Sequence, residues 1–403
     1  MKHIVIIGGG AAGLLAANYA KQENTKVTIL EKNPICGKKI LATGNGKCNY
    51  WNSDISKVKY NSCDKELLDN IFTEENINDT YNYLEKLGIY PSIKNGYYYP
   101  YSNQASSIRE IFITNLKKKH VKVITNSKVE SITKENNGFK VVTESEEYLC
   151  DKVVISAGSK SYPKTGSDGS GYIFAESFNH TITELTSALA PIRMNEKYLK
   201  DWNGVRCSVT LNLDINGKKY SESGEVQLTD YGISGICVFN ISSFISHALL
   251  NKEEVRLTIN FLPFTKDPMS FMNDRYNNLI DLNLEEMLES IFNYKLLHVL
   301  FKVAGIKKES RWNEISYTER QRLIDVLTNF NVNIDEVIFD KGQVTSGGVK
   351  LSEVNVENFE SKKVKDLYFT GELLDVDGIC GGFNLGFAFI SGYVVGRCLD
   401  DHN

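Results

Sequence analysis

Residues suited to binding a phosphate-bearing ligand stand at the start of the chain. An apolar run, Ile4 to Ile7, leads directly into Gly8-Gly-Gly10-Ala-Ala-Gly13, and a helix-forming stretch follows. In such a Gly-x-Gly-x-x-Gly turn, the first glycine allows the tight turn, the second lets a pyrophosphate approach the backbone, and the third allows a helix to pack closely on a strand. The free amides of the helix then face the phosphate charge. The spacing predicts a dinucleotide site at Gly8, Gly10, Ala11, Ala12 and Gly13.

An acidic residue follows at the distance that a dinucleotide fold requires. A second apolar segment, Val27 to Leu30, ends at Glu31, which lies 18 residues beyond Gly13. In βαβ units of this kind the ribose-binding acid stands roughly 20 residues after the glycine turn. We therefore expect Glu31 to accept hydrogen bonds from both ribose hydroxyls. A glycine turn alone also occurs for structural reasons, but the strand, the helix and the acid together favour a dinucleotide-binding role.

The loop after this acid is rich in groups that can wrap a charged cofactor. Residues 36–49 combine glycines, amides, a hydroxyl group and three lysines, with apolar residues such as Ile40 and Cys48 between them. A solvated surface loop is the alternative, yet the interspersed apolar residues favour a loop packed around a ligand. The predicted cofactor contacts in and before this loop are Lys32, Lys39, Thr43, Gly44, Asn45, Gly46, Lys47, Cys48 and Asn49.

Further strands are needed to build the sheet that positions these residues. Strand patterns occur at 122–132 and 139–143 and in the apolar run from Lys152, which leads into Ala157-Gly158. Apolar strands that end at small residues suit the carboxyl edge of a parallel sheet, where ligands bind in this class of fold. The predicted cofactor contacts on these segments are Val129, Ala157 and Gly158. The tyrosine-rich segment 97–101 is interpreted as a hairpin around Asn95-Gly96 rather than as a substrate-binding wall.

The pattern changes near residue 191, where alternating strands begin. Strand patterns at 208–213, 219–220, 226–228 and 255–261 are followed by helical patterns at 284–292, 295–304 and 319–330. A strand at 366–370 and a helix from Phe383 then return to the first pattern. The sequence thus predicts an α/β protein whose Rossmann-like domain is built from both chain ends, 1–190 and 340–403. The insert, 191–339, is predicted to have a β-rich part, 191–265, and a small helical lobe, 266–339.

Bulk composition limits the partners and the compartment. The 403 residues carry 46 Lys and Arg against 50 Asp and Glu without long charged blocks, so nucleic acid is not the expected partner. Hydrophobic residues at 42 % and charged residues at 24 % are typical of globular proteins. Glycines interrupt the apolar stretches 4–20 and 379–396, which favours a strand with its turn and a buried helix over membrane segments. Because neither stretch is interpreted as a targeting segment, the eight cysteines are expected to be reduced thiols in the cytoplasm. They form no Cys-x-x-Cys pair, so a metal site has no support.

Six sequence blocks resemble one protein family along nearly the whole chain. They are Gly8 to Gly13, Gly37 to Asn49, Gly158 to Gly166, Thr229 to Gly235, Val344 to Val349 and Tyr368 to Asn384. In this order they resemble the BaiN-like or YhiN-like flavoproteins, which include bile-acid enone reductases and aminoacetone oxidases. The resemblance implies FAD as the cofactor, with a β-rich domain and a helical lobe inserted between two halves of the FAD domain. Two departures are Asn45, where glycine is usual, and Lys47, where the usual arginine would offer a planar fork.

The resemblance also implies a function. It implies further cofactor contacts at Gly371, Glu372, Gly381, Gly382, Phe383 and Asn384. The implied reaction is the reduction of a conjugated carbon-carbon double bond in an enone-type small molecule, such as a steroid or bile acid, with NAD(P)H as the electron donor. The alternative reaction is that of an amine oxidase that uses oxygen. A flavoprotein that acts on RNA would need a basic face, which the sequence does not indicate. A non-catalytic flavin-binding sensor is a further alternative that the sequence does not exclude. Cys48, Tyr162 and Tyr231 are conceivable proton donors, and none of them is assigned.

Two further expectations concern the cofactor and its reductant. The helix from Phe383 should direct its amino end at the pyrimidine edge of the flavin, where negative charge develops on reduction. Because the sequence has one dinucleotide fingerprint, NAD(P)H should bind transiently at the flavin rather than in a second nucleotide domain. The insert should then be a barrel or sandwich that meets the substrate cleft. The oligomeric state stays open.

Overall fold

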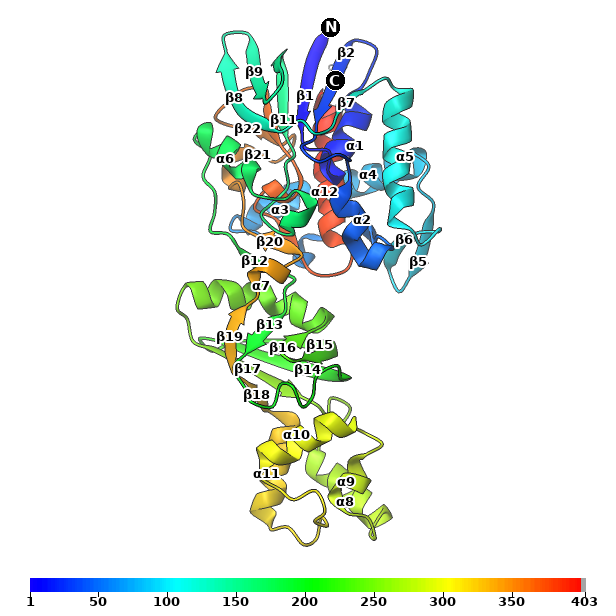
Figure 1. Ribbon diagram of the computed structural model, residues 1–403, viewed down its shortest axis with the longest axis vertical. Helices are drawn as coiled ribbons and strands as arrows, with labels where there is room; N and C mark the ends of the chain where they lie inside the picture. Colours follow the sequence, from blue (N-terminus) through cyan, green and yellow to red (C-terminus); the bar gives the residue numbers. More distant parts are fainter. Residues whose placement is uncertain (400–403) are drawn as a thin grey trace. The chain divides into compact units, whose positions relative to one another are not determined.

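The computed structural model describes residues 1–399, which divide into two units (Figure 1). Unit 1 contains both ends of the chain, Met1–Thr186 and the residues from Gln343 onward, and unit 2 is the continuous segment Ser187–Gly342. Each unit has its own hydrophobic core. The predicted α/β fold, with a parallel sheet built from both chain ends, is confirmed. Among the described residues, no helix combines the length and the apolar character needed to cross a membrane.

A seven-stranded sheet forms the centre of unit 1. In spatial order its strands are β21 (Val354–Asn355), β22 (Glu360–Ser361), β23 (Leu367–Phe369), β11 (Lys152–Ile155), β1 (Lys2–Ile7), β2 (Thr25–Leu30) and β7 (Lys122–Ile124). The five strands from β23 to β7 are parallel, whereas β21 and β22 pair antiparallel. All of β11 and the last four residues of β1 are buried, as is typical of inner strands covered by helices on both faces.

The longest helix of unit 1 packs directly on the first one. The helices are α1 (Ala11–Ala20), α2 (Lys38–Ala42), α3 (Leu68–Ile71), α4 (Glu74–Lys86), α5 (Ala105–Lys118), α6 (Ser170–Ser177) and α12 (Phe383–Leu399). Glycines allow the backbones of α1 and α12 to touch: a Cβ at Gly392 would lie 2.4 Å from Ala12 O, and one at Gly396 would lie 2.7 Å from Tyr19 Cβ. Figure 1 shows α12, in red, beside α1, in blue.

Residues 129–150 form a separate antiparallel sheet, which corrects the sequence prediction. The strands β8 (Val129–Glu135), β9 (Gly138–Thr143) and β10 (Glu147–Cys150) pair in the order β10-β9-β8. The strand predicted at 122–132 is therefore two strands, and only β7 belongs to the parallel sheet. Buried and partly exposed residues alternate along β9, and this alternation is typical of an antiparallel strand with one face toward solvent.

The hairpin predicted around Asn95-Gly96 is confirmed. Strand β5 (Pro91–Lys94) pairs with β6 (Tyr97–Pro100), and the two turn residues have φ values of 51° and 81°, as the tight turn requires. Strand β6 also pairs with β3 (Trp51–Asn52). The other short strands are β4 (Tyr60–Asn61), which pairs with β24 (Asp377–Gly378), and β12 (Thr186–Ala188) and β20 (Val344–Ser346).

Unit 2 is built on one antiparallel sheet. In spatial order its strands are β18 (Phe330–Val332), β17 (Val255–Asn260), β14 (Arg206–Ile215), β15 (Lys218–Thr229), β16 (Gly232–Ser234), β13 (Ile192–Met194) and β19 (Ile334–Val337). The first and last strands of this order, β18 and β19, are separated by Asn333 alone. Residues 330–337 therefore pair with β17 at one end and with β13 at the other, and this closes the sheet in the manner of the expected barrel. The strand patterns at 219–220 and 226–228 both belong to β15, which is one long strand.

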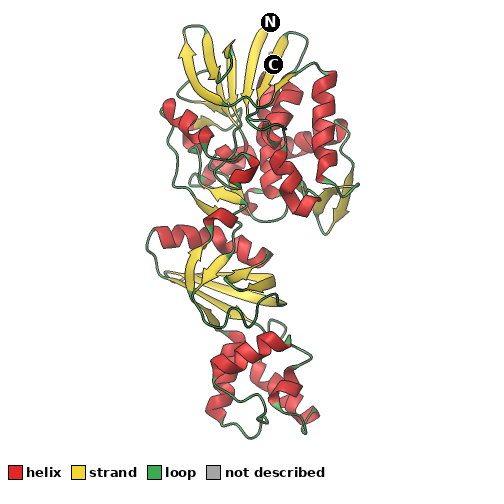
Figure 2. Ribbon diagram, viewed as in Figure 1, coloured by secondary structure: helices red, strands yellow, loops and turns green. Residues whose placement is uncertain are grey.

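The helices of unit 2 correct the predicted division of the insert. They are α7 (Ile236–Leu250), α8 (Pro268–Asn278), α9 (Leu284–Leu288), α10 (Tyr294–Ala304) and α11 (Tyr317–Thr328). Helix α7 lies in the part predicted to be β-rich, β18 and β19 lie in the part predicted to be helical, and the helix predicted at 284–292 ends at Leu288. Figure 2 shows the helices from α8 to α11 gathered in a lobe. This lobe and the sheet share one apolar core, to which Leu257, Leu297 and Leu323 contribute.

Candidate functional site

Most of the predicted site residues leave the central sheet of unit 1 at one edge. Ile7 of β1 is opposite Leu30 of β2 and Ile155 of β11, and Ile155 is opposite Phe369 of β23. These strand ends are therefore level with one another at the carboxyl edge, the place where parallel sheets bind ligands. The predicted residues that follow these strand ends are Gly8, Glu31, Ala157, Gly158, Gly371 and Glu372.

The three glycines of the Gly-x-Gly-x-x-Gly turn differ in what requires glycine at each position. A Cβ at Gly8, where φ is +103°, would lie 2.3 Å from Ser156 O, and a Cβ at Gly13 would lie 2.2 Å from Gly8 O. Backbone oxygen atoms of the protein thus leave no room for a side chain at either position. A Cβ at Gly10 would meet no atom within 4 Å, and the φ of −77° there is open to any residue. Neither packing nor backbone conformation requires glycine at position 10, which leaves the space in front of it available to a ligand.

Gly10 is the one glycine of the chain's 30 with this property. Every other glycine has either a positive φ or a Cβ position within 3.2 Å of another atom. Gly10 is also the N-cap of α1, where no side chain caps the helix and the first turn holds no acid. Uncapped amides and the positive end of the helix dipole therefore border the open space, which suits a phosphate group.

Glu31 supports the glycine turn from the end of β2. Its Oε2 accepts a hydrogen bond from Gly9 N at 2.8 Å, and its Oε1 accepts from Asn33 N and Asn33 Nδ2, both at 2.8 Å. The side chain is buried. Because a carboxylate has about four acceptor positions, this arrangement leaves one for a ribose hydroxyl, where the sequence led us to expect two.

Side chains fix the backbone of the two glycines that precede α12. Asn52 Nδ2 donates to Gly381 O at 2.9 Å. In the amide orientation that satisfies both of its polar atoms, Asn49 accepts from Gly382 N at 3.3 Å. A Cβ at Gly382, where φ is +91°, would lie 2.6 Å from Trp51 O, so glycine is required for this approach. The predicted contacts Asn49, Gly381 and Gly382 are thus brought together.

The first turn of α12 is fixed as well. The Asn384 side chain accepts from Gly378 N and donates to Gly378 O, both at 2.8 Å. Tyr60 donates its hydroxyl to Phe383 O at 2.9 Å. The amino end of α12 therefore has a defined position before any ligand binds.

The helices α1 and α12 direct their amino ends the same way. The Gly392 position adjoins Ala12, and the Gly396 position adjoins Ala16 one turn later, so the two helices run parallel. Helix α12 begins nine residues before Gly392. At 1.5 Å per residue, its amino end therefore extends about 13 Å beyond the level of Ala12. Two positive helix ends with such an offset along the helix axes suit an extended ligand that carries negative charge at two points.

The loop before Asn49 has a left-handed backbone at three successive residues. The φ values of Gly44, Asn45 and Gly46 are 55°, 52° and 83°. Asparagine adopts this conformation more readily than most other residues, which explains how the loop accommodates it at position 45. Thr43, at the start of the loop, donates its hydroxyl to the backbone of α2 at 2.6 Å. Cys48 is fully buried, and burial raises the pKa of its thiol to about 11, which disfavours it as a proton donor.

An ion pair joins residues 36–49 to the end of β23. Lys39 Nζ lies 2.5 Å from Glu372 Oε2 and donates to Ser161 Oγ at 2.9 Å. Ser159 Oγ donates to the same carboxylate oxygen at 3.2 Å, and the two serine hydroxyls are 2.9 Å apart. The Lys39 and Glu372 side chains are 25 % and 16 % exposed. Neither serine was predicted as a site residue, although both lie in the block 158–166 that carried the family resemblance.

Breaking this ion pair should destabilise unit 1. In a Glu372→Gln variant, Lys39 keeps its charge in a mostly buried position without its carboxylate partner. We expect the free energy of unfolding to fall by about 1–3 kcal/mol, a range that allows for partial solvent screening. Urea denaturation of Glu372→Gln, Lys39→Met and the double variant measures the coupling free energy between these two side chains.

The double variant should lose less stability than the two single losses added together, because neither charge is then left alone. The exposed pair Lys57 and Asp69, whose charged atoms are 2.6 Å apart, provides the matched control and should show little coupling. Strictly additive losses at Lys39 and Glu372 would contradict the proposed coupling.

The remaining predicted contacts differ in their placement. Val129 begins β8, two residues after Ser127, whose amide donates to Glu31 O at 2.9 Å. Ala157 adjoins the glycine turn, since a Cβ at Gly8 would lie 3.0 Å from Ala157 Cα. Of the two remaining lysines, Lys32 pairs with Asp168 at 2.6 Å, and Lys47 is exposed.

The two tyrosines considered as proton donors lie in different units. Tyr162, in unit 1, is 41 % exposed and has a positive φ of 59°. Tyr231, in unit 2, has Lys341 Nζ 3.6 Å from the centre of its ring. Neither observation assigns a catalytic role, so the proton donor stays unassigned.

Two buried carboxylates that were not predicted as site residues, Asp375 and Asp377, lie between Glu372 and Gly381. Asp377 accepts hydrogen bonds from Ser346 Oγ at 2.6 Å and from Asn61 Nδ2 at 3.3 Å. Burial raises the pKa of Asp377 to about 6, the two hydrogen bonds oppose this shift, and the nearby Asp375 carboxylate reinforces it. The signal available in the sequence was an Asp-x-Asp pair inside an otherwise apolar run. Within residues 1–399, no group of three or more His, Cys, Asp or Glu residues is placed to hold a metal ion.

Comparison with known proteins finds relatives along the whole chain. The family described as HI0933-like protein Rossmann domain matches residues 2–398. A 3-dehydro-bile acid delta(4,6)-reductase of Clostridium scindens is 35 % identical over 405 residues, which covers 98 % of each chain. A ribosomal RNA dihydrouridine synthase of Escherichia coli is 27 % identical over 399 residues, which covers 98 % of this chain and 97 % of that one.

A solved structure shares the fold. The open conformation of a flavocytochrome c3 fumarate reductase aligns with a TM-score of 0.52 and 14 % sequence identity, covering 99 % of this chain and 78 % of that one. At this identity the likeness concerns the fold alone.

Proposed function

Because the chain belongs to the HI0933-like family of Rossmann-domain proteins and is an FAD-dependent oxidoreductase, we propose that it reduces a conjugated carbon-carbon double bond of a steroid-like enone. We further propose NAD(P)H as its electron donor. The family resemblance seen in the sequence blocks is confirmed. The observation that carries the cofactor assignment is the open space at Gly10, in front of the uncapped amino end of α1.

The residues at the carboxyl edge fit the parts of FAD. The Gly10 backbone and the first amides of α1 would hold the pyrophosphate, and the remaining acceptor position of Glu31 would hold a ribose hydroxyl. The amino end of α12, about 13 Å farther along by its helical rise, would stabilise negative charge at the edge of the ring system. When bound, FAD supplies hydride transfer and accepts electrons from a nicotinamide.

The names of the two curated relatives describe related chemistry. A 3-dehydro bile acid with a delta(4) double bond is an enone, because the double bond is conjugated with the C3 carbonyl. Reduction of uridine to dihydrouridine also saturates a double bond that is conjugated with a carbonyl. Both names therefore support reduction of a polarised double bond, and the choice between a small molecule and RNA depends on other features of the chain.

Charge favours the small molecule. Unit 2, the proposed substrate cap, carries 18 Lys and Arg against 21 Asp and Glu, and the whole chain has a net charge of −4. Proteins that bind RNA through its phosphates present a basic surface. RNA is nevertheless the second candidate, because the dihydrouridine synthase matches 98 % of the chain.

The reductase proposal is tested by the colour of the FAD-loaded protein in the absence of oxygen. We expect NADH or NADPH to bleach the visible absorbance of oxidised flavin and a 3-oxo-delta(4) steroid to restore it. NAD(P)⁺ and the enone should compete for one enzyme form, because the sequence has one dinucleotide fingerprint and the nicotinamide must leave before the enone binds. The corresponding saturated 3-oxo steroid is the matched control and should leave the protein bleached.

Other outcomes would indicate a different substrate, a different reaction or a different mode of nicotinamide binding. Recovery of colour with uridine-containing RNA and not with the steroid would assign RNA as the substrate. A protein that ignores NAD(P)H but consumes oxygen in the presence of aminoacetone would be the amine oxidase. A stable ternary complex of protein, NADPH and enone would contradict transient binding of the nicotinamide.

A further inference from the structure

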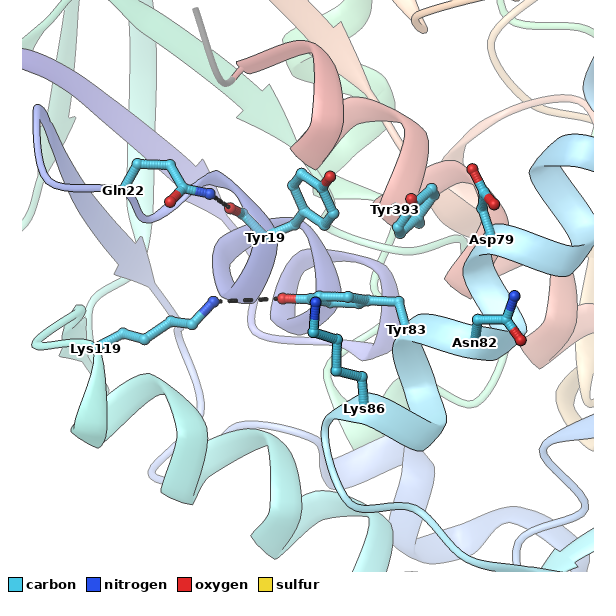
Figure 3. A pocket seen from close by; sticks show the side chains of 8 residues that line it. All are labelled: Tyr19, Gln22, Asp79, Asn82, Tyr83, Lys86, Lys119 and Tyr393. Atoms are coloured by element: carbon cyan, nitrogen blue, oxygen red, sulfur yellow. Dashed lines mark hydrogen bonds between the residues drawn. The ribbon is translucent and has the colours of Figure 1, made fainter. Parts of the chain in front are cut away.

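We propose that a pocket at the carboxyl-terminal half of α1 and α12 is a second ligand site, which binds a small molecule that combines a planar ring with an anionic group. The pocket is a cavity of about 400 Å³ within unit 1, lined by Tyr19, Gln22, Asp79, Asn82, Tyr83, Lys86, Lys119 and Tyr393 (Figure 3). Its volume lies in the range of about 300–1,000 Å³ that is typical of small-molecule sites. This inference is independent of the proposed function.

Three tyrosine rings form the apolar part of this pocket. The ring centres of Tyr19 and Tyr83 are 5.0 Å apart, those of Tyr19 and Tyr393 are 5.0 Å apart, and those of Tyr83 and Tyr393 are 5.7 Å apart. Figure 3 shows that the rings come from three different helices, α1, α4 and α12. Tyr393 is buried, whereas Tyr19 and Tyr83 are partly exposed, so these two rings offer surface for stacking with a planar ligand.

Two lysines form the charged part. Lys119, just after α5, donates to Asn18 O and to the Tyr83 hydroxyl, the latter at 3.4 Å. Tyr83 donates in turn to Asn18 O at 3.0 Å. An ammonium group has three donors, and these contacts use two of them. Lys119 is therefore fixed at the pocket with a donor to offer to an anion.

The electrostatic balance of the pocket is positive. Burial lowers the pKa of Lys119, and the positive charge of the neighbouring Lys86 lowers it further. Asp79 is the acidic residue of the lining, and its carboxylate lies 3.7 Å from Arg397 Nη1. Arg397 also lies over the Tyr393 ring, 5.8 Å from its centre. An anion bound near Lys86 and Lys119 would relieve the repulsion between these two ammonium groups.

This pocket is distinct from the dinucleotide site. Tyr19 is the ninth of the ten residues of α1, and Tyr393 is in the second half of α12, whereas the dinucleotide site uses the amino ends of both helices. A bound dinucleotide would therefore leave the pocket free. Two sources share the required chemistry, an aromatic carboxylate and a nucleoside monophosphate, and the experiment separates them.

The test uses the FAD-loaded protein, so that a nucleotide probe does not enter the cofactor site. We titrate AMP and 1-naphthoate separately by calorimetry, with adenosine and naphthalene-1-carboxamide as uncharged controls. We expect at least one of the two anions to bind with a Kd below about 1 mM and its uncharged partner to bind at least about tenfold more weakly. The preferred anion identifies the source of the ligand.

Matched variants locate the binding. Lys86→Gln and Lys119→Gln should each raise the Kd about tenfold, whereas Lys118→Gln, an exposed lysine of the same segment as Lys119, should not change it. Lys86 is exposed, so its replacement also tests the site if the Lys119 variant proves unstable. Failure of both anions to bind, equal binding of the uncharged controls, or equal effects of Lys86→Gln and Lys118→Gln would each overturn the proposal.

Discussion

Replacing Gly10 by valine is expected to give a folded protein that purifies with less than about a tenth of the normal flavin content. The fold should tolerate the change, because a Cβ at this position meets no atom within 4 Å and the φ of −77° is accessible to valine. The side chain would instead fill the space in front of α1, where the pyrophosphate should approach. Loss of two charge-assisted hydrogen bonds to a phosphate would weaken FAD binding by about a hundredfold or more.

The ratio of flavin to protein after purification measures this effect, and thermal unfolding of the flavin-free protein measures stability. Gly10→Ala should give an intermediate flavin content. Gly13→Ala is the contrasting control, because its Cβ would lie 2.2 Å from Gly8 O and should destabilise even the flavin-free chain. Full flavin content in a folded Gly10→Val protein would show that the pyrophosphate does not lie there.

Replacing Asp377 by asparagine is expected to remove a pH dependence of stability. Burial raises the pKa of Asp377 to about 6 from an ordinary value of 3.8, so the folded protein binds this proton more tightly than the unfolded chain does. Stability from this group is therefore fully present below about pH 4 and is lost as the pH rises through about 6. The loss amounts to about 3 kcal/mol, since each unit of pKa shift corresponds to about 1.4 kcal/mol.

The measurement is the free energy of unfolding of both proteins between pH 4 and 7 by urea denaturation. The difference between Asp377→Asn and the unchanged chain should shift in favour of the variant by about 3 kcal/mol across this range. Asp281→Asn, an exposed carboxylate in unit 2, should show no such shift. A constant difference at all pH values would mean that Asp377 stays ionised in the folded protein.

The sequence predicted best those features that depend on neighbouring residues. The turn Gly8 to Gly13 and the hairpin at Asn95-Gly96 are each defined by a few adjacent residues whose backbone preferences are strong. Helix α7 was missed although its apolar residues recur at helical spacing, because the strands on either side of it suggested a purely β-rich segment. The sheet at 129–150 was misassigned because short apolar strands look alike until their partners are known.

By itself the sequence determined that a strand, a glycine turn, a helix and an acid begin the chain, since these follow from local spacing. Tertiary structure alone decided that backbone atoms leave no room for a side chain at Gly8 and Gly13, whereas the space next to Gly10 is free of other atoms. It also decided that Lys39 meets Glu372, 333 residues away, and that α12 lies parallel to α1 with its amino end farther forward. The physical reason is that backbone preferences act over a few residues, whereas the approach of distant segments depends on how closely their side chains allow them to pack.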